Sequence, residues 1–244
     1  MATPFAITDA KIYLSGYDLS GSSNSVSIAY EFPGIEVTSF GSDCHYKIPG
    51  IPDLNIEAGG FAMTDGTDES EDVIEALLGT ANTPVSIGYS GADGTPGYFT
   101  KMMEHARSLG GPIGEAFGFQ IQGCAQGYKL VRGYYLAPRA SRTSSDTGTA
   151  KEISAVTATQ KVYSALHVFA ASGTSPTLDV IVASDENTDF GSAVTRITHT
   201  QFDDVGSEIK SVDGAITDDC WRVGWTIGGT DDPTFDFAVL VGII

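Results

Sequence analysis

The stretch that decides the fold is Ser25–Phe32, with the sequence SVSIAYEF. Val26, Ile28 and Tyr30 point to one side of an extended chain, because small or polar residues separate them. This period of two is typical of a β-strand that buries one face and exposes the other. The segment therefore predicts a strand at the edge of a hydrophobic core.

The same alternation recurs along the rest of the 244 residues, between segments rich in turn residues. Pro33–Gly34 is such a turn, and we expect Ile35–Phe40 to return beside the first strand, so that Val26–Phe40 forms a hairpin. The other clear cases are Leu54–Ala58, Leu178–Val182, Trp221–Ile227 and Phe235–Val241. High Gly, Thr, Ser, Val and aromatic content also favours many short strands joined by tight turns.

One segment has the signals of a helix. Thr67 or Asp68 can cap its start, the acidic residues that follow suit its positive end, and Gly79 can end it. Val73 and Ile74 fall on one face, together with Leu77 and Leu78. The sequence therefore predicts an all-β protein with one short helix.

Residues 138–148 (PRASRTSSDTG) are polar and lack apolar periodicity. Such a composition favours a linker, and it divides the chain into a β-domain over 1–139 and a second domain over 140–244. Every element after the linker has the pattern of a strand, which predicts a C-terminal β-sandwich of seven or eight strands.

The formal net charge is −18, which argues against attraction to nucleic acid, because phosphate binding needs clustered Lys and Arg. Residues 129–161 are the exception, with six basic and two acidic side chains. They form either a solvated linker or a contact strip for an acidic face of a neighbouring copy. In the second case Arg132, Arg139 and Arg142 are the candidate contact residues.

Catalytic and metal-binding motifs are weak or missing in the sequence. The three cysteines, at positions 44, 124 and 220, include no CxxC pair, so a zinc ribbon or disulfide framework is not indicated. Asp185, Asn187 and Asp189 resemble the start of a calcium loop, but its sixth and twelfth positions hold Phe190 and Arg196. We predict no enzyme activity, no cofactor and no metal.

Two further features leave alternatives open. Trp221 and Trp225 alternate on one strand, as core residues do, although an exposed platform for sugars has the same spacing. The segment Gly41–Pro52 is long for a hairpin loop and holds Tyr46, Ile48 and Ile51 without an evident core for them. It is either an assembly loop that contacts neighbouring subunits or a mobile surface loop.

The first half holds the short segments Asp18–Gly21 (DLSG), Asn24–Ser27 (NSVS), Glu36–Gly41 (EVTSFG) and Ile48–Gly50 (IPG). These segments resemble parts of the tail tube proteins of long-tailed bacteriophages (siphophages). Ser172–Leu178 and Trp221–Gly229 are similar to a C-terminal domain that some of these proteins carry. The resemblance implies a tail-tube-type β-sandwich or barrel domain followed by a second β-sandwich domain on the tube exterior.

The resemblance also implies a function. Six copies would form a ring with a continuous inner barrel, and stacked rings would form a hollow conduit for viral DNA, which passes without specific binding. The expected partners are other copies and further tail proteins: the tape measure, terminator and distal tail proteins. The expected place is the virion, after assembly in the host cytoplasm, and we expect no contact with a membrane, because no stretch approaches 18 apolar residues.

The resemblance finally implies which residues line the conduit. The candidates are Glu31, Glu36, Asp53 and Glu57, which alternate with apolar residues on predicted strands. An acidic lumen would repel DNA phosphates; the alternative is that these carboxylates solvate the outside of the tube. Other functions that fit acidic β-domains are a capsid decoration or other virion surface protein, and a carbohydrate-binding module.

Overall fold

The computed structural model describes residues 8–63 and 70–244, and within them the chain is mostly β with one short helix, as predicted. Contacts group the chain into two units. Unit 1 consists of 1–21, 83–101 and 131–244, and unit 2 consists of 22–82 and 102–130. No helix among the described residues is long and apolar enough to cross a membrane.

The boundary expected at 139/140 is wrong, because residues 139 and 140 lie inside strand β10. Two segments of the first half, 1–21 and 83–101, also belong with the C-terminal half in unit 1. The physical reason is hydrogen bonding: the end of β10 pairs with β16 as far as Arg142↔Phe235, so the polar stretch is part of a sheet. The predicted division into 1–139 and 140–244 is replaced by units that each draw on separated segments.

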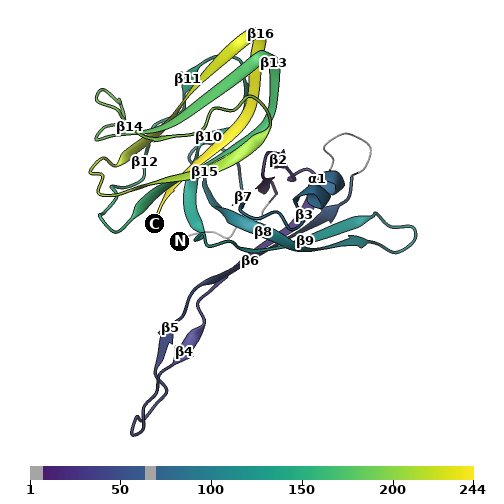
Figure 1. Ribbon diagram of the computed structural model, residues 1–244, viewed down its shortest axis with the longest axis vertical. Helices are drawn as coiled ribbons and strands as arrows, with labels where there is room; N and C mark the ends of the chain where they lie inside the picture. Colours follow the sequence, from purple (N-terminus) through teal and green to yellow (C-terminus); the bar gives the residue numbers. More distant parts are fainter. Residues whose placement is uncertain (1–7, 64–69) are drawn as a thin grey trace. The chain divides into compact units, whose positions relative to one another are not determined.

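Unit 1 is a β-sandwich built around two long antiparallel strands, β13 (Lys161–Asp185) and β16 (Cys220–Ile243) (Figure 1). Their pairing shifts register near Ser172 and Thr174, where the pair bends, so that the two halves of one continuous sheet form the two layers of the sandwich (Figure 1). Gly173 and Gly229 adopt φ angles of 108° and 122° there, which a residue with a Cβ rarely adopts. The predicted C-terminal strands are therefore present, but long strands with a bend replace several short ones.

The other strands of unit 1 extend the sheets on both sides of this pair. β10 and β15 flank the first half of β13 and the second half of β16, whereas β11, β12 and β14 flank the remaining halves. The bounds are β1 (Lys11–Leu14), β2 (Tyr17–Asp18), β7 (Thr83–Gly88), β8 (Pro96–Gly110, which continues into unit 2), β10 (Val131–Arg142), β11 (Asp146–Thr147), β12 (Lys151–Glu152), β14 (Val194–Thr198) and β15 (Gly206–Asp213).

The core of unit 1 lies between these sheets and consists of inward-facing aliphatic and aromatic residues. They include Val162, Leu166, Leu178, Val180, Trp221, Val223, Phe235, Phe237 and Val239. Trp221 is fully buried, and Trp225 packs partly buried against the same cluster with Arg142 over its ring. Both tryptophans therefore take the core role that their spacing favoured, and they do not form an exposed platform for sugars.

Unit 2 is a four-stranded antiparallel sheet in the order β3–β6–β9–β8. Its elements are β3 (Ser23–Glu31), β4 (Gly34–Glu36), β5 (Lys47–Pro49), β6 (Asp53–Phe61), α1 (Ser70–Leu77) and β9 (Gly118–Ala125), with the second part of β8. One face of the sheet carries Leu54, Ile56, Phe119 and Ile121, and all four are buried.

The position of the helix and the glycine that ends it were predicted correctly. Val73 and Ile74 are buried, Leu77 is half-buried and Leu78 is exposed, so its apolar face is narrower than expected. Gly79 has a φ of 76° and its N–H donates to the Glu104 carbonyl at 2.8 Å, which ends the helix against β8. The cap candidates Thr67 and Asp68 lie outside the described residues.

The predicted hairpin over Val26–Phe40 is wrong. β3 pairs with β6, from Ser23↔Gly60 to Glu31↔Asp53, and β4 pairs with β5. The Pro33–Gly34 turn signal therefore does not reverse the chain; it separates two successive ladders of a single long hairpin. Lys47–Pro49, expected in a loop, is strand β5.

A buried histidine, His167, ties strands of unit 1 together. The His167 ring accepts the Ser86 hydroxyl at Nε2 (2.7 Å) and donates from Nδ1 to the Ser15 carbonyl (2.6 Å), so β13 is bonded to β7 and to the turn after β1. Burial lowers the pKa of His167 to about 4, because the charged ring would lose its hydration. The native protein therefore holds this histidine neutral well below its ordinary pKa.

We expect unit 1 to lose stability as the pH falls from about 6.5 to about 4. In that range the unfolded chain binds a proton at His167 and the native chain does not. Once this difference is complete, the free energy of unfolding is lower by about 3 kcal/mol. Denaturant unfolding followed by the fluorescence of Trp221 and Trp225, both in unit 1, measures it. Unchanged or rising stability between pH 6.5 and 4.5 would contradict this account of His167.

Candidate assembly surface

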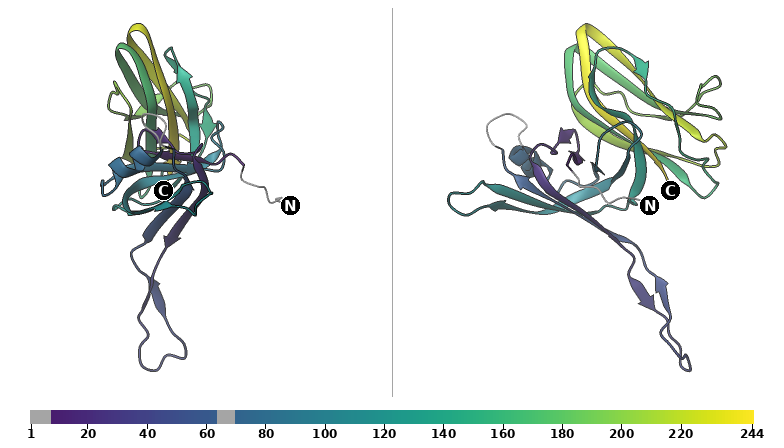
Figure 2. Two further views of the ribbon diagram at one scale, coloured as in Figure 1. Left: turned by 90° about the vertical axis from the view of Figure 1, so that its right-hand side faces the viewer. Right: turned by 180° about the vertical axis from the view of Figure 1, so that it is seen from behind.

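A two-stranded ribbon leaves the sheet of unit 2 at the end where β3 ends and β6 begins (Figure 2). It continues the β3–β6 hairpin through β4 and β5, with Gly34↔Pro49, Ile35↔Ile48 and Glu36↔Lys47 in register. The Gly50 N–H donates to the Pro33 carbonyl at 2.7 Å and the Val37 N–H to the Tyr46 carbonyl at 2.9 Å. The backbone of residues 33–50 is thus hydrogen-bonded as a ribbon and is not a simple loop.

The ribbon has one apolar and one polar face. Two residues that pair across the ribbon lie on the same face, and so does every second residue along each strand. Ile35, Val37, Tyr46 and Ile48 therefore lie together on one face. The opposite face holds Glu36↔Lys47 and the contact of His45 Nδ1 with Glu36 Oε1 at 2.5 Å.

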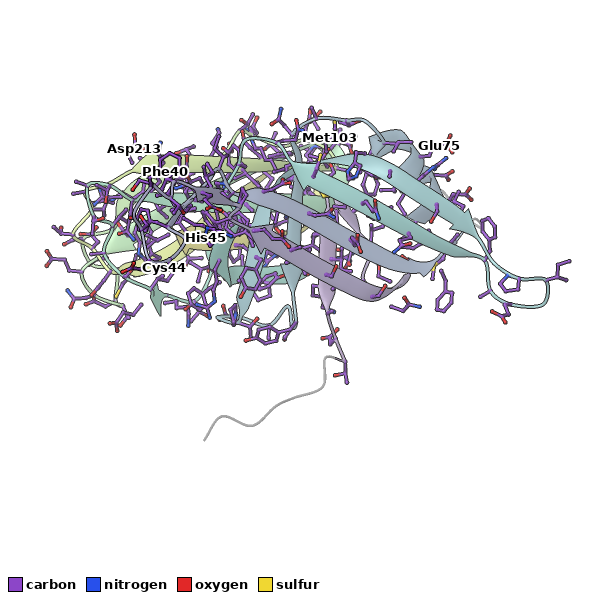
Figure 3. All side chains as sticks on the ribbon, turned by 90° about the horizontal axis from the view of Figure 1, so that it is seen from below. Phe40, Cys44, His45, Glu75, Met103 and Asp213 are labelled. Carbon is purple, nitrogen blue, oxygen red and sulfur yellow. The ribbon has the colours of Figure 1, made fainter. Side chains whose placement is uncertain are left out.

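The apolar face of the ribbon is exposed. The exposed fractions are 51% for Ile35, 44% for Val37, 64% for Tyr46 and 40% for Ile48, and Ile51 beyond them is 87% exposed. Phe40, Cys44 and His45, which Figure 3 labels, belong to the connection between β4 and β5. A contiguous apolar face of this kind on a thin ribbon is typical of a surface that another protein covers. The structure therefore leaves Tyr46, Ile48 and Ile51, the predicted contact residues, free to meet a partner.

A second set of exposed apolar side chains lies at the opposite end of the same sheet, on both of its faces, and the sequence did not predict it. Phe61 pairs with Gly118 in register, and the Ala62 N–H donates to the Phe117 carbonyl at 2.9 Å. Phe61, Met63, Ile113 and Phe117 are 48%, 44%, 106% and 50% exposed. The only signal in the sequence was Ile113 and Phe117 inside the Gly-rich segment 110–127. We call this set the end patch.

Three of the four predicted lumen carboxylates share one face of the unit 2 sheet. Glu31 lies directly opposite Asp53, and Glu57 lies four residues further along β6, opposite Ser27 and Gln122. The Gln122 amide donates to Glu57 at 3.3 Å. This face is the one turned away from the buried aliphatic residues, and near these carboxylates it is mostly polar. Glu36 is not part of it, because it lies on the ribbon.

The edge of this sheet is open at β3. Among the described residues β3 pairs with β6 alone, so the backbone N–H and C=O groups on its outer edge are available along nine residues. An open edge of this length is a template for pairing with another strand. Unit 2 thus presents the ribbon, the end patch and a strand edge.

The predicted contact arginines differ in the contacts that they make within unit 1. Arg139 forms ion pairs with Asp18 and with Asp236, the latter at 2.7 Å from Nη2, and it stacks on Phe169. Arg142 donates to the carbonyls of Ala140, Pro138 and Phe237 and stacks on Phe237.

Both of these arginines therefore serve the fold of unit 1, which explains their place at the end of β10. Arg132 is exposed on β10, with its guanidinium 5.7 Å from the centre of the Tyr134 ring.

One cluster in unit 1 has the arrangement of a hydrolase triad. Ser164 Oγ lies 2.9 Å from His199 Nε2, and His199 Nδ1 lies 3.1 Å from Glu208 Oε2. Ser164 and His199 are 0% and 3% exposed, so no substrate reaches the hydroxyl. Burial lowers the pKa of His199, which keeps the ring neutral. The cluster therefore links β13 to β15 as a buried hydrogen-bond network.

A metal-ligand cluster is absent from the part of the chain that the structure describes. It contains no group of three or more His, Cys, Asp or Glu side chains placed to hold a metal ion. The calcium-like segment is a tight connection, because the Asp185 carboxylate accepts the backbone N–H groups of Asn187 at 3.1 Å and Ser192 at 2.8 Å.

No protein-family model and no curated protein matches this sequence. Among solved structures, the chain is similar to a chain of the SPP1 tail tube, with 13% identity, 52% of this chain and 78% of that chain covered, and a TM-score of 0.43. A chain of the tail of an empty gene transfer agent particle is 15% identical over 53% of this chain and 97% of its own, with a TM-score of 0.41. A chain of the sheath–tube complex of an extracellular contractile injection system is 13% identical over 52% and 90%, with a TM-score of 0.42.

Proposed function

We propose that this chain is a structural protein that polymerises with copies of itself into a tube, as the tail tube subunit of a phage or phage-like particle. The observation that carries the proposal is the amphipathic ribbon, whose apolar face has no partner within the described part of unit 2. The sequence motifs that resemble siphophage tail tube proteins support it independently. The role is structural, and the proposed partners are further copies and the other tail proteins.

The geometry of unit 2 suits a head-to-tail contact. The ribbon and the end patch lie at opposite ends of one sheet, so a ribbon that covers the end patch of the next copy leaves its own end patch free. Contacts between two different surfaces propagate into rings or open filaments, whereas a twofold contact would close at a dimer. The open edge of β3 would add a neighbouring strand within a ring and extend the sheet towards a closed barrel.

In this assembly the polar face of the unit 2 sheet lines the channel, with six copies in a ring. Each of Glu31, Asp53 and Glu57 would then be repeated six times around the lumen. Rings of carboxylates repel DNA phosphates, so DNA would pass without adhering. Unit 1, with its own closed core, would lie on the outside of the tube.

Replacing Ile35 and Ile48 by Ser should prevent polymerisation and leave the subunit folded. Both side chains are already half exposed in the monomer, so the change removes burial that only the assembly would provide. We expect the critical concentration for assembly to rise on the order of tenfold or more. Electron microscopy and pelleting of the purified chain measure it.

The matched control for the ribbon variant is Lys47→Gln, on the polar face of the same ribbon, which should assemble normally. Phe117→Ser, in the end patch, should reproduce the defect of the ribbon variant. Normal tubes from the Ile35 and Ile48 variant would refute the role of the ribbon.

Replacing Glu31 and Glu57 by Lys should convert the channel into a DNA-binding surface. Added positive charge would bind phosphates with release of counterions, so empty tubes of the variant should retain DNA at low salt and release it at high salt. Glu186→Lys, an exposed position of unit 1, changes the charge without touching the sheet face. If tubes of the double variant ignore DNA and behave like those of the Glu186 control, the polar face does not line the channel.

A further inference from the structure

Unit 2 buries a carboxyl group that has no partner. Glu104 on β8 is 1% exposed, and neither of its side-chain oxygens has a hydrogen-bond partner among the described residues. A buried carboxylate without a partner is costly, and native proteins rarely keep one without a reason. Burial raises the pKa of Glu104 to about 7, and nearby Arg107 offsets part of this increase.

A β-bulge brings Glu104 and Arg107 to the same face of the sheet. Residues three apart on a regular strand point to opposite faces. Here Glu104 is opposite Gly123 and Ala106 is opposite Gln122, so His105 is the extra residue in the bulge. Arg107 is therefore opposite Ile121, on the buried face that also carries Glu104. Bulges commonly re-aim a side chain in this way.

Only one of the two terminal nitrogens of Arg107 has a partner among the described residues in this position. Its Nη2 lies 3.3 Å from Oε2 of Glu75 on α1, where Figure 3 labels Glu75. Its other terminal nitrogen, Nη1, is buried and has no partner within the described chain. A buried carboxylate and a buried guanidinium nitrogen thus both lack partners, although they lie two register positions apart on one face.

The remaining charged groups of the neighbouring elements do not compete for Glu104. On α1, the buried residues are Ser70, Val73 and Ile74, so the acidic side chains lie off its buried face. In the part of β8 that belongs to unit 2, His105 is exposed, and β9 has no charged residue. Arg107 is the charged group that acts on Glu104.

We propose that the guanidinium of Arg107 switches between two partners. While Glu104 is protonated, Arg107 holds α1 through its ion pair with Glu75. When Glu104 ionises, Arg107 turns inward and pairs with that carboxylate. The protonated state matches the structure, in which the Glu75 contact is made and Glu104 stands alone. Ionisation makes the unpaired state costly, and Arg107 on the same face has an unpartnered donor in Nη1. The helix then loses its ion pair to β8, so α1 is held less firmly at high pH.

The linkage has a definite sign. The folded-state pKa of Glu104 lies above its ordinary value of 4.5, so this group favours the native state below pH 4.5, and that contribution is lost as the pH rises towards 7. Hydrogen exchange of α1 amides in the full-length chain, corrected for the intrinsic effect of pH, should therefore speed up on the order of tenfold between pH 5.5 and 8.5.

Three variants test the mechanism. Glu104→Gln cannot ionise, so the exchange of α1 should become independent of pH. Glu75→Gln should speed up α1 exchange at pH 5.5, where the pair with Arg107 exists, and have no effect at pH 8.5, where Arg107 has left. Glu115→Gln, in the exposed turn before β9, is the control and should follow the unchanged chain.

A merely structural Glu75–Arg107 pair would give the same Glu75→Gln effect at both pH values, and that result would overturn the proposal. A Glu104→Gln variant that keeps the pH dependence would overturn it as well. The titration of the Glu104 side-chain carbonyl carbon by NMR adds a direct readout: an apparent pKa near 7 is expected, and one at or below 4.5 excludes the switch.

Discussion

The rest of the account depends on one constraint: a two-stranded ribbon has no second layer against which it can bury an apolar face. Two strands are marginally stable in water even when their side chains suit pairing. In this chain the ribbon keeps its backbone hydrogen bonds and places Ile35, Val37, Tyr46 and Ile48 on one exposed face. An apolar face of this kind is typical of a surface that another protein covers, and in the proposed assembly the end patch of a second copy would cover it.

The two units differ in how completely they pair their polar groups by hydrogen bonds and bury their apolar side chains. Unit 1 closes a sandwich around fully buried residues such as Trp221 and Phe235, and it uses its buried histidines as hydrogen-bond acceptors between strands. Unit 2 has a thinner core, an open strand edge, two exposed apolar surfaces and an unpartnered buried carboxyl at Glu104. Unit 2 is therefore the part of the chain in which assembly and adjustment would take place.

The sequence predicted the strands well and their partners poorly. Period-two alternation at 26–32 and at 54–58 marks which residues face the core, because that is a local property. It does not say that β3 pairs with β6 across the ribbon, since pairing depends on contacts between segments far apart in the chain. The Pro33–Gly34 signal marks only the break between the β3–β6 and β4–β5 ladders, and the chain does not reverse there.

The amino-acid composition led to one wrong prediction, the linker at 138–148, and gave no sign of two other features. The stretch 138–148 is polar for a structural reason, because Arg139 and Arg142 are held by carboxylates, carbonyls and aromatic rings of unit 1. Exposed Tyr46, Ile48 and Ile51 were evident from the sequence, because apolar residues in a Pro- and Gly-rich segment lack a core. The end patch and the Glu104–Arg107 arrangement were not, since the first needs the β6–β9 register and the second needs the bulge.

The central claim is that the ribbon is buried by another copy of the chain. Hydrogen exchange of the amides of residues 33–51, measured at increasing protein concentration, tests it most directly. The account predicts that these amides become protected together with the appearance of assemblies, and that the strands of unit 1 keep the protection they have in the monomer. Assemblies that form while the ribbon amides exchange as fast as in the monomer would contradict it.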